Sequence, residues 1–276
     1  MNSQDFEFVA QLVRKRVGIV LTGDKLYLLE SRLAPLARKE GLPSIDDLIH
    51  VVRSRREERL INQVVDVMTT SETYFFRDKT PFEHLREAIF PGLSGARHGG
   101  RIRVWCAACS TGQEPYSIAM MLDENPQLTD GVPVEIVATD ISDRSLERAR
   151  QGLFTQFEVQ RGLPIQMLMR HFTQQDDHWR ISERQRQQVT FRKQNLVDAT
   201  YSLGGKFDVV LCRNVLTYFD GPTKNAVLGR LAQHLNPGGF LILGAAESVV
   251  GLTDAFEPAQ DRRGLYKVVT RASKAA

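Results

Sequence analysis

Glu114 is an acidic residue at a position where a phosphate-binding loop would exclude negative charge. An apolar run over residues 104–108 meets a short turn at residues 110–112, and a helix is then expected with Pro115 in its first turn. Strand, glycine turn and helix together hold nucleotide-type ligands in open α/β sheets. In the phosphate-binding version, amide N–H groups and a positive helix end face an anion, which a carboxylate would repel. Glu114 therefore favours a cationic ligand.

S-adenosylmethionine is a ligand of this kind, because it combines an adenosine half with a sulfonium and an ammonium and has no phosphate. The turn carries a single glycine, Gly112, and not the G-x-G-x-x-G pattern. The sequence therefore disfavours a NAD-dependent dehydrogenase and favours a protein that binds S-adenosylmethionine.

Polar residues also follow the next expected strands. Asp140 ends the run 134–139, where an acidic side chain can accept both ribose hydroxyls of an adenosine. The alternative is a helix N-cap, a role that Ser142 or Asp143 can fill instead. Asn195 and Leu196 follow an expected strand at 189–194 and suit the edge of an adenine, although asparagine is common in loops.

Two further segments allow two readings each. Cys212 and Arg213 open a polar loop that ends at Tyr218 and Phe219 and follows the run 207–211, so it is either part of a ligand site or an ordinary surface loop. Residues 69–78 contain paired aromatics, hydroxyls and Arg77. That pattern alone favours a capped helix whose aromatics pack between domains over a lid across a ligand.

The elements that must position these residues form two parts. Apolar residues repeat every three to four positions through residues 1–72, which predicts an all-helical N-terminal domain. From residue 101, strands are expected at 102–107, 134–139, 207–212 and 239–244, with helices near 113–124, 143–151 and 222–235. This alternation predicts an α/β domain over residues 73–276 with a mostly parallel sheet. Residues of about 152–194 fit the pattern poorly and indicate an inserted helix and antiparallel hairpin; a loose tail is expected after Val269.

Composition narrows the class of protein. The chain has 276 residues, 42% hydrophobic and 25% charged, as in ordinary globular proteins, and its net charge of +3 argues against nucleic acid as a partner. No signal peptide or membrane-spanning run is visible, so no direct membrane insertion is expected. The three cysteines predict buried reduced thiols and a cytoplasmic protein, and the six histidines show no metal-ligand spacing, so no metal is expected.

Several motifs resemble those of the CheR family, the chemotaxis receptor glutamate O-methyltransferases. They follow one another along the chain in the family's order, and the resemblance covers nearly the whole chain. The specific strings are Ser-Thr-Gly-Gln-Glu-Pro-Tyr-Ser at 110–117 and Cys-Arg-Asn followed by Tyr-Phe-Asp between 212 and 220. The matching pieces also include 71–77, 138–141 and 195–196. The resemblance implies an all-α N-terminal domain and a Rossmann-like methyltransferase domain with a small inserted antiparallel β-subdomain.

The resemblance also assigns roles by matching position. Glu114 falls at the methionine ammonium, Asp140 at the ribose, and Asn195 with Leu196 at the adenine. Cys212 and Arg213 match positions that line the cofactor cleft. The positions that close over the methionine part are matched by Ser71, Thr73 and Arg77. Arg77 and Tyr218 flank the transfer site as the catalytic pair. The family commonly has asparagine where this chain has Ser71.

The reaction implied moves a methyl group from S-adenosylmethionine to a receptor glutamate and leaves S-adenosylhomocysteine. The alternatives are a cofactor-binding regulator without transfer and a methyltransferase that acts on another substrate. The implied partner is the cytoplasmic domain of a chemotaxis receptor, bound by a monomer.

Two departures from the family bear on that partner. Arg32 and Arg38 fit its receptor-facing helix, but Pro35 and Leu36 stand where more arginines are common, and a proline inside a helix removes a hydrogen bond. Members that grip a receptor's C-terminal tail tend to have a glycine-containing hairpin extension, whereas this chain has the short turn 174–177. We expect docking without a tail tether.

Overall fold

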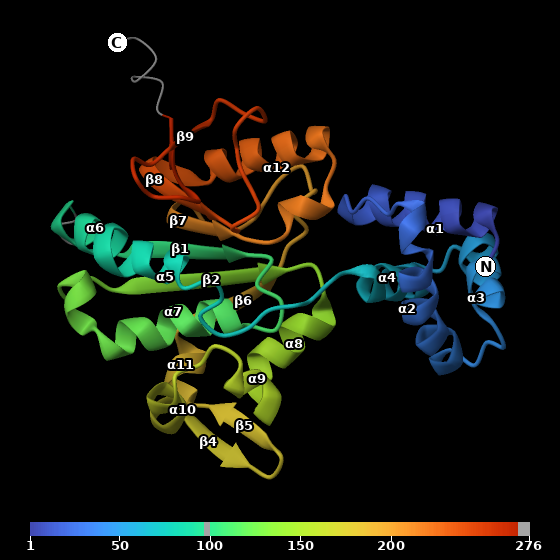
Figure 1. Cartoon of the computed structure of the whole chain (residues 1–276), viewed down its shortest axis with the longest axis horizontal. Coiled ribbons are helices and arrows are strands. Elements are labelled where there is room, and N and C mark those ends of the chain that lie inside the picture. The colour runs from blue at the N-terminus through green and yellow to red at the C-terminus, as the bar shows by residue number, and fades with distance from the viewer. Residues whose placement is uncertain (97–99, 270–276) are drawn as a thin grey trace. The chain divides into compact units, whose positions relative to one another are not determined.

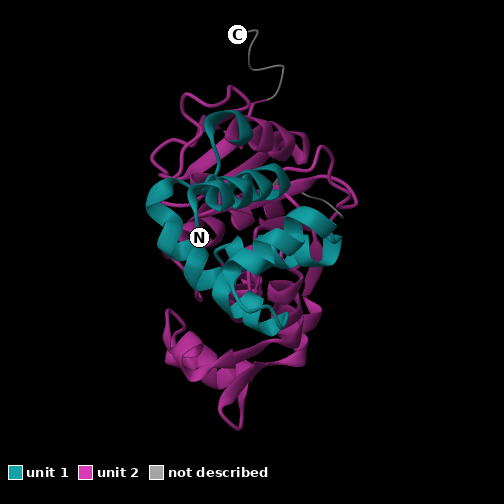
Figure 2. Ribbon diagram, turned by 90° about the vertical axis from the view of Figure 1, so that its right-hand side faces the viewer, with its two compact units in different colours: residues 1–70, 218–223 teal, residues 71–217, 224–276 magenta. Residues whose placement is uncertain are grey.

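The chain forms two compact units. The computed structural model describes residues 1–96 and 100–269, so the tail expected to be loose lies outside the described residues. Residues 1–70 form one unit together with 218–223, and residues 71–217 form the other together with the chain from 224 onward (Figure 2). Each unit is described by itself below.

The first unit contains the predicted helices α1 (Ser3–Val17), α2 (Leu26–Lys39), α3 (Ile45–Arg55) and α4 (Glu58–Met68). Their ends follow the sequence signals, because the Ser44 hydroxyl accepts the Asp47 N–H at the start of α3 and Gly18 closes α1 with a φ of 74°. Apolar side chains at helical spacing fill the core, among them Phe6, Val9, Val13, Leu29, Leu33, Leu48, Ile61, Val64 and Met68.

Helix α2 continues through Pro35, which lies in its interior. Leu29, Leu33 and Leu36 of the same helix are buried, and their packing compensates for the hydrogen bond that proline cannot donate. Arg32 donates to the carbonyls of Met68, at 2.8 Å, and Thr69, at 3.2 Å. Arg32 therefore caps the end of α4.

Residues 218–223 pack with the helices of the first unit, although they follow a strand of the second unit in the chain. Phe219 forms an antiparallel bridge with Ile19, and the Tyr218 carbonyl accepts the N–H of Val20 at 2.9 Å. Asp220 pairs with Arg14 at 2.6 Å. Tyr218 is thus fixed through its backbone by the segment that follows α1.

The second unit is built on a seven-stranded sheet in the described part of the chain, in the order β6-β2-β1-β7-β8-β10-β9. The strands are β1 (Ile102–Ala107), β2 (Val134–Asp140), β6 (Val189–Lys193), β7 (Phe207–Cys212), β8 (Leu235–Leu243), β9 (Phe256–Pro258) and β10 (Leu265–Val268). The first five in that order are parallel, while β10 and β9 are antiparallel. Ala107 pairs with Thr139 and with Cys212, so β1, β2 and β7 end at one edge, where open α/β sheets bind ligands.

Helices cover both faces of this sheet, as the alternating pattern predicts. Figure 1 shows α7 (Gln113–Glu124) and α8 (Asp143–Gln151) on one side and α12 (Gly221–Gln233) on the other. Before β1 come α5 (Thr80–His84), a π-helical turn at Leu85–Ile89 and α6 (Phe90–Ala96). Apolar residues of α5 and the π-helical turn share one core with α7 and β1.

The inserted segment forms a small sheet of its own with strand order β3-β5-β4, all antiparallel. It comprises β3 (Leu153–Thr155), α9 (Gln156–Gln160), α10 (Ile165–His171), β4 (Phe172–Gln175), β5 (His178–Ile181) and α11 (Glu183–Gln187). The prediction that residues 189–191 belong to this insertion is wrong, because β6 pairs in parallel with β2. Val189 is buried and Phe191 packs against the large core, so this strand closes the edge of the main sheet.

Among the described residues, no helix has both the length and the apolar character needed to cross a membrane. All three cysteines are free and buried.

Asp220 gives a pH-dependent test of the hydrogen bonds at the start of α12, where its carboxylate accepts the N–H of Thr223 at 2.9 Å. Hydrogen bonds from Thr223, with a smaller effect of Arg14, lower the pKa of Asp220 from 3.8 to about 2. Because the folded-state pKa is depressed, the stabilisation is complete above the unfolded value and is lost as pH falls through the folded one. We expect Asp220→Asn to lower the free energy of unfolding, measured with urea, by a constant amount above about pH 5. Below about pH 4 the difference from wild type should shrink. A difference that stays constant down to about pH 3 would contradict this account.

Candidate active site

The turn after β1 has an unusual backbone conformation, and its last position, Gly112, has no room for a side chain. Ala108, Ser110 and Gly112 all have positive φ, and Gly112 has the largest at 94°. A Cβ on Gly112 would lie 3.0 Å from the Cβ of Ala149 and 3.1 Å from the Tyr116 ring. Helix α7 can therefore begin directly against α8, and Glu114 lies in its first turn.

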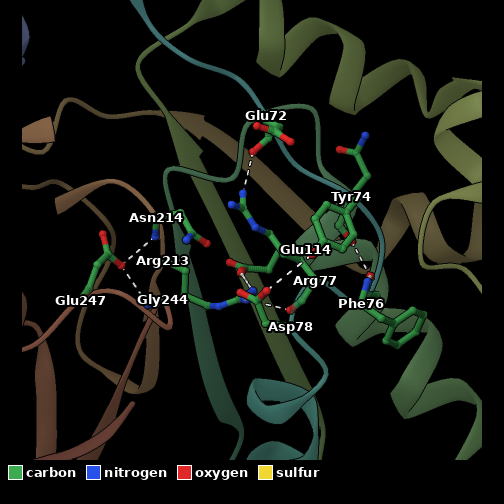
Figure 3. A network of polar contacts seen from close by, with 12 residues as sticks. Glu72, Tyr74, Phe76, Arg77, Asp78, Glu114, Arg213, Asn214, Gly244 and Glu247 are labelled. Carbon is green, nitrogen blue, oxygen red and sulfur yellow. Dashed lines mark hydrogen bonds and ion pairs between the residues drawn. The ribbon is translucent and has the colours of Figure 1, made fainter. Parts of the chain in front are cut away.

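Glu114 and Arg213 form a buried ion pair at the edge where β1 and β7 end. Nη1 of Arg213 donates to Oε2 of Glu114 at 2.7 Å, and the two side chains are 2% and 11% exposed. Nη2 donates to Asp78 at 2.9 Å and to the Arg77 carbonyl at 2.7 Å (Figure 3). Two carboxylates share one guanidinium, so the three groups keep a formal charge of −1, which suits a cationic ligand.

Arg213 still has a hydrogen-bond donor to offer. Its Nε is buried and has no hydrogen-bond partner within the described ranges. Leaving a buried donor of a charged group unpaired is costly, so this N–H can donate to an acceptor of a bound ligand or water. A carboxylate beside an ammonium, as in an amino acid, would match Arg213 and Glu114 together.

Cysteine thiols beside this pair add no negative charge. Burial raises the pKa of Cys106, Cys109 and Cys212 well above the ordinary value, and the carboxylate of Glu114 raises each of them further. Cys212 is fully buried at the end of β7. It can line a ligand site only as a neutral, weakly polar surface.

Asp140 is not the N-cap of α8. The Ser142 hydroxyl fills that role by accepting the Ser145 N–H at 3.1 Å. The Asp140 carboxylate accepts the N–H of Ser110 at 2.8 Å and that of Ser142 at 2.9 Å, and so joins the turns after β1 and β2. Contact with a ribose stays a prediction.

Asn195 and Leu196 follow β6, as expected. The Asn195 side chain accepts the Val197 N–H at 3.3 Å, while the buried Leu196 uses its carbonyl to accept from Tyr201 at 2.6 Å and Arg230 at 3.1 Å. These bonds fix the backbone of a turn beside the end of β2. Their place at an adenine stays a prediction.

Residues 71–78, which we call the strap, are not helical, so the capped-helix interpretation of this segment is wrong. Phe75 is fully buried in the core of the second unit. The Ser71 carbonyl accepts the Ser110 hydroxyl at 2.8 Å, which ties the strap to the glycine turn. Thr73 is partly buried in the strap.

Arg77 contacts the strap itself. It donates to the Glu72 carbonyl at 2.8 Å, and its guanidinium lies 5.6 Å from the centre of the Tyr74 ring (Figure 3). Ser71, Thr73, Arg77, Glu114, Asp140, Asn195, Leu196, Cys212 and Arg213 all belong to the second unit, whereas Tyr218 belongs to the first. The pairing of Arg77 with Tyr218 stays a prediction.

Two carboxylates of this region are not among the predicted site residues. Asp78 directly follows Arg77 in the chain, and it shares the Arg213 guanidinium with Glu114. Glu247 follows β8, and its Oε2 accepts the N–H groups of Asn214 at 2.7 Å and Gly244 at 2.8 Å. Its position after a parallel strand was the signal that could have found it. No group of three or more His, Cys, Asp or Glu that could hold a metal occurs in the part of the chain described.

Both units match families of known proteins. The family described as "CheR methyltransferase, all-alpha domain" matches residues 4–69, and "CheR methyltransferase, SAM binding domain" matches residues 71–265. A "Chemotaxis protein methyltransferase" of Vibrio parahaemolyticus is 41% identical over 272 residues, 97% of this chain and 98% of the relative. "Chemotaxis protein methyltransferase 1" of Pseudomonas aeruginosa is 42% identical over 265 residues, 95% of this chain and 96% of the relative.

Glu247 should stabilise the loop that carries Arg213. Its Oε1 also accepts the Thr217 N–H at 3.2 Å, so the carboxylate serves three backbone donors. An amide in its place would turn an NH₂ group toward at least one of them, and we expect Glu247→Gln to cost about 1–2 kcal/mol in urea unfolding. Glu257→Gln, at an exposed position on β9, is the control. Equal stabilities of the two variants would rule out this role for Glu247.

Proposed function

Because this chain belongs to the CheR family of S-adenosylmethionine-dependent methyltransferases, we propose that it methylates the side-chain carboxylates of glutamates in a chemotaxis receptor. The products would be a glutamate methyl ester and S-adenosylhomocysteine. The observation that supports this most directly is the buried Arg213 with Glu114 and Asp78, a cluster of formal charge −1 at the ligand-binding edge of the sheet. The three free, buried cysteines suit a reducing compartment such as the cytoplasm.

The chain's own residues fit the cofactor. Glu114 would bind its ammonium group, and the free Nε of Arg213 would donate to its carboxylate. Asp140 would accept from the ribose hydroxyls, with Asn195 and Leu196 at the adenine. Ser71, Thr73 and Arg77 would close over the methionine part, and Cys212 would line the cleft as a neutral thiol. When bound, the sulfonium supplies an electrophilic methyl group.

The substrate carboxylate needs no general base. A glutamate with a pKa near 4.3 is already ionised at neutral pH, so its oxygen is nucleophilic as it arrives. The protein's task is alignment and exclusion of water, and correct alignment can be worth about 7–11 kcal/mol. Arg77 would orient the carboxylate and Tyr218 would donate a hydrogen bond to it.

Transfer of a labelled methyl group tests this function. The purified chain is incubated with methyl-labelled S-adenosylmethionine and a receptor cytoplasmic domain, and the product is treated with alkali. A glutamate methyl ester releases labelled methanol. Binding of the cofactor without any label would instead indicate a regulator, and alkali-stable label would indicate another substrate.

Arg77→Ala should separate turnover from cofactor binding. Without the guanidinium the substrate carboxylate loses its orienting partner, so we expect kcat to fall by more than about tenfold, or about 1.4 kcal/mol. Affinity for S-adenosylhomocysteine, measured by calorimetry, should fall less. Arg86→Ala, at an exposed arginine of the same unit, is the matched control. Unchanged turnover in Arg77→Ala would remove this residue from the mechanism.

The hairpin of the inserted segment supports docking to the receptor without a tail tether. Strands β4 and β5 are joined by Asp176 and Asp177 alone, and Asp176 has a φ of 49°. The turn therefore has no extension that could hold a peptide. We expect no measurable heat when a peptide of the receptor's C-terminal tail is titrated into the protein, and tight binding would refute this proposal.

A further inference from the structure

The inserted segment contacts the strap at a point where no side chain can be accommodated. Gly162, between α9 and α10, has a φ of +84°. A Cβ there would lie 2.0 Å from the carbonyl oxygen of Phe75 and 3.1 Å from the Tyr74 ring. Glycine is required here both by the backbone conformation and by the approach of the strap.

Aromatic side chains of the inserted segment also pack against the strap. The Phe75 ring meets Phe154 of β3 edge-on at 5.0 Å and Phe172 of β4 at 5.6 Å. All three rings are buried in one core. The middle of the strap is thus packed against two strands of the inserted sheet.

Arg161, next to Gly162 in the chain, also contacts the strap. Its Nη2 donates to Glu72 at 2.7 Å, and its guanidinium lies 4.3 Å from the centre of the Tyr74 ring. This ion pair is the main reason that the pKa of Glu72 is lowered. Tyr74 and Glu72 are also the residues that Arg77 contacts, through the ring and the carbonyl respectively (Figure 3).

We propose that Arg161 and Gly162 are positioning residues for methyl transfer, which fix the strap and, through Glu72 and Tyr74, the guanidinium of Arg77. The inserted segment then contributes to the cofactor site indirectly, through the strap. This inference rests on the proposed function, because it assigns to the strap the cofactor contacts of Ser71, Thr73 and Arg77.

The first test compares two glycines. Gly162→Ala adds a methyl group that collides with Phe75, whereas Gly131→Ala adds one at a similar φ of +77° with nothing within 4 Å. The two positions have similar positive φ, so the difference between the variants reports mainly the displaced strap. We expect Gly162→Ala to weaken S-adenosylhomocysteine binding at least tenfold and Gly131→Ala to leave it unchanged.

A second pair keeps the test valid if Gly162→Ala fails to fold. Arg161→Gln removes the ion pair with Glu72 and the contact with the Tyr74 ring. Arg148→Gln removes a comparable ion pair, with Glu158, in the same unit. We expect Arg161→Gln to raise the KM for the cofactor three- to tenfold and to speed amide hydrogen exchange in residues 71–78 at unchanged Tm. Arg161→Lys should restore part of the loss, and Arg148→Gln should match wild type.

The outcomes separate the two proposals. A wild-type chain that binds no S-adenosylhomocysteine would refute the proposed function. Equal exchange rates in residues 71–78 for Arg161→Gln and Arg148→Gln would refute the positioning role, whatever the cofactor does. Faster exchange without any change in cofactor affinity or turnover would also overturn the positioning role, because the contacts of Arg161 with the strap would then be merely structural.

Discussion

The site depends on one buried cation, the guanidinium of Arg213. It is 2% exposed and joins three segments far apart in the chain, because it bonds to Asp78, to Glu114 and to the Arg77 carbonyl. Removing one partner of a buried ion pair leaves an uncompensated charge and typically costs about 3–5 kcal/mol. The strap, the start of α7 and the loop after β7 therefore hold one another in place.

The same cation explains how a turn with a buried carboxylate can be stable. Arg213 pairs with both carboxylates, with Asp78 at 2.9 Å and with Glu114 at 2.7 Å, so two acidic side chains can lie beside one buried cation. The three groups together carry a formal charge of −1. The neighbouring Cys106, Cys109 and Cys212 stay neutral because burial raises the pKa of their thiols. Electrostatics at this edge is thus determined by a few charged groups.

The sequence predicted the parts of the structure whose signals are local. Helical periodicity, the Ser44 cap and the Gly18 stop located the first unit, and the alternation of strands and helices located the main sheet. Glu114, Asp140, Asn195 and Arg213 could be singled out because they follow expected strands. The roles of Ser71, Thr73 and Arg77 were predicted only from the family resemblance. Long-range pairing left no such signal. Nothing local shows that residues 189–193 join β2, or that Phe75 packs against Phe154 and Phe172.

The close approach at Gly162 has a consequence for reading other sequences. Even alanine there would overlap the Phe75 carbonyl, which lies 2.0 Å from where its Cβ would be. A related chain that carries any other residue at this place must run the segment equivalent to the strap along a different path. The residue at this one position therefore indicates whether a homologue places its backbone as this chain does.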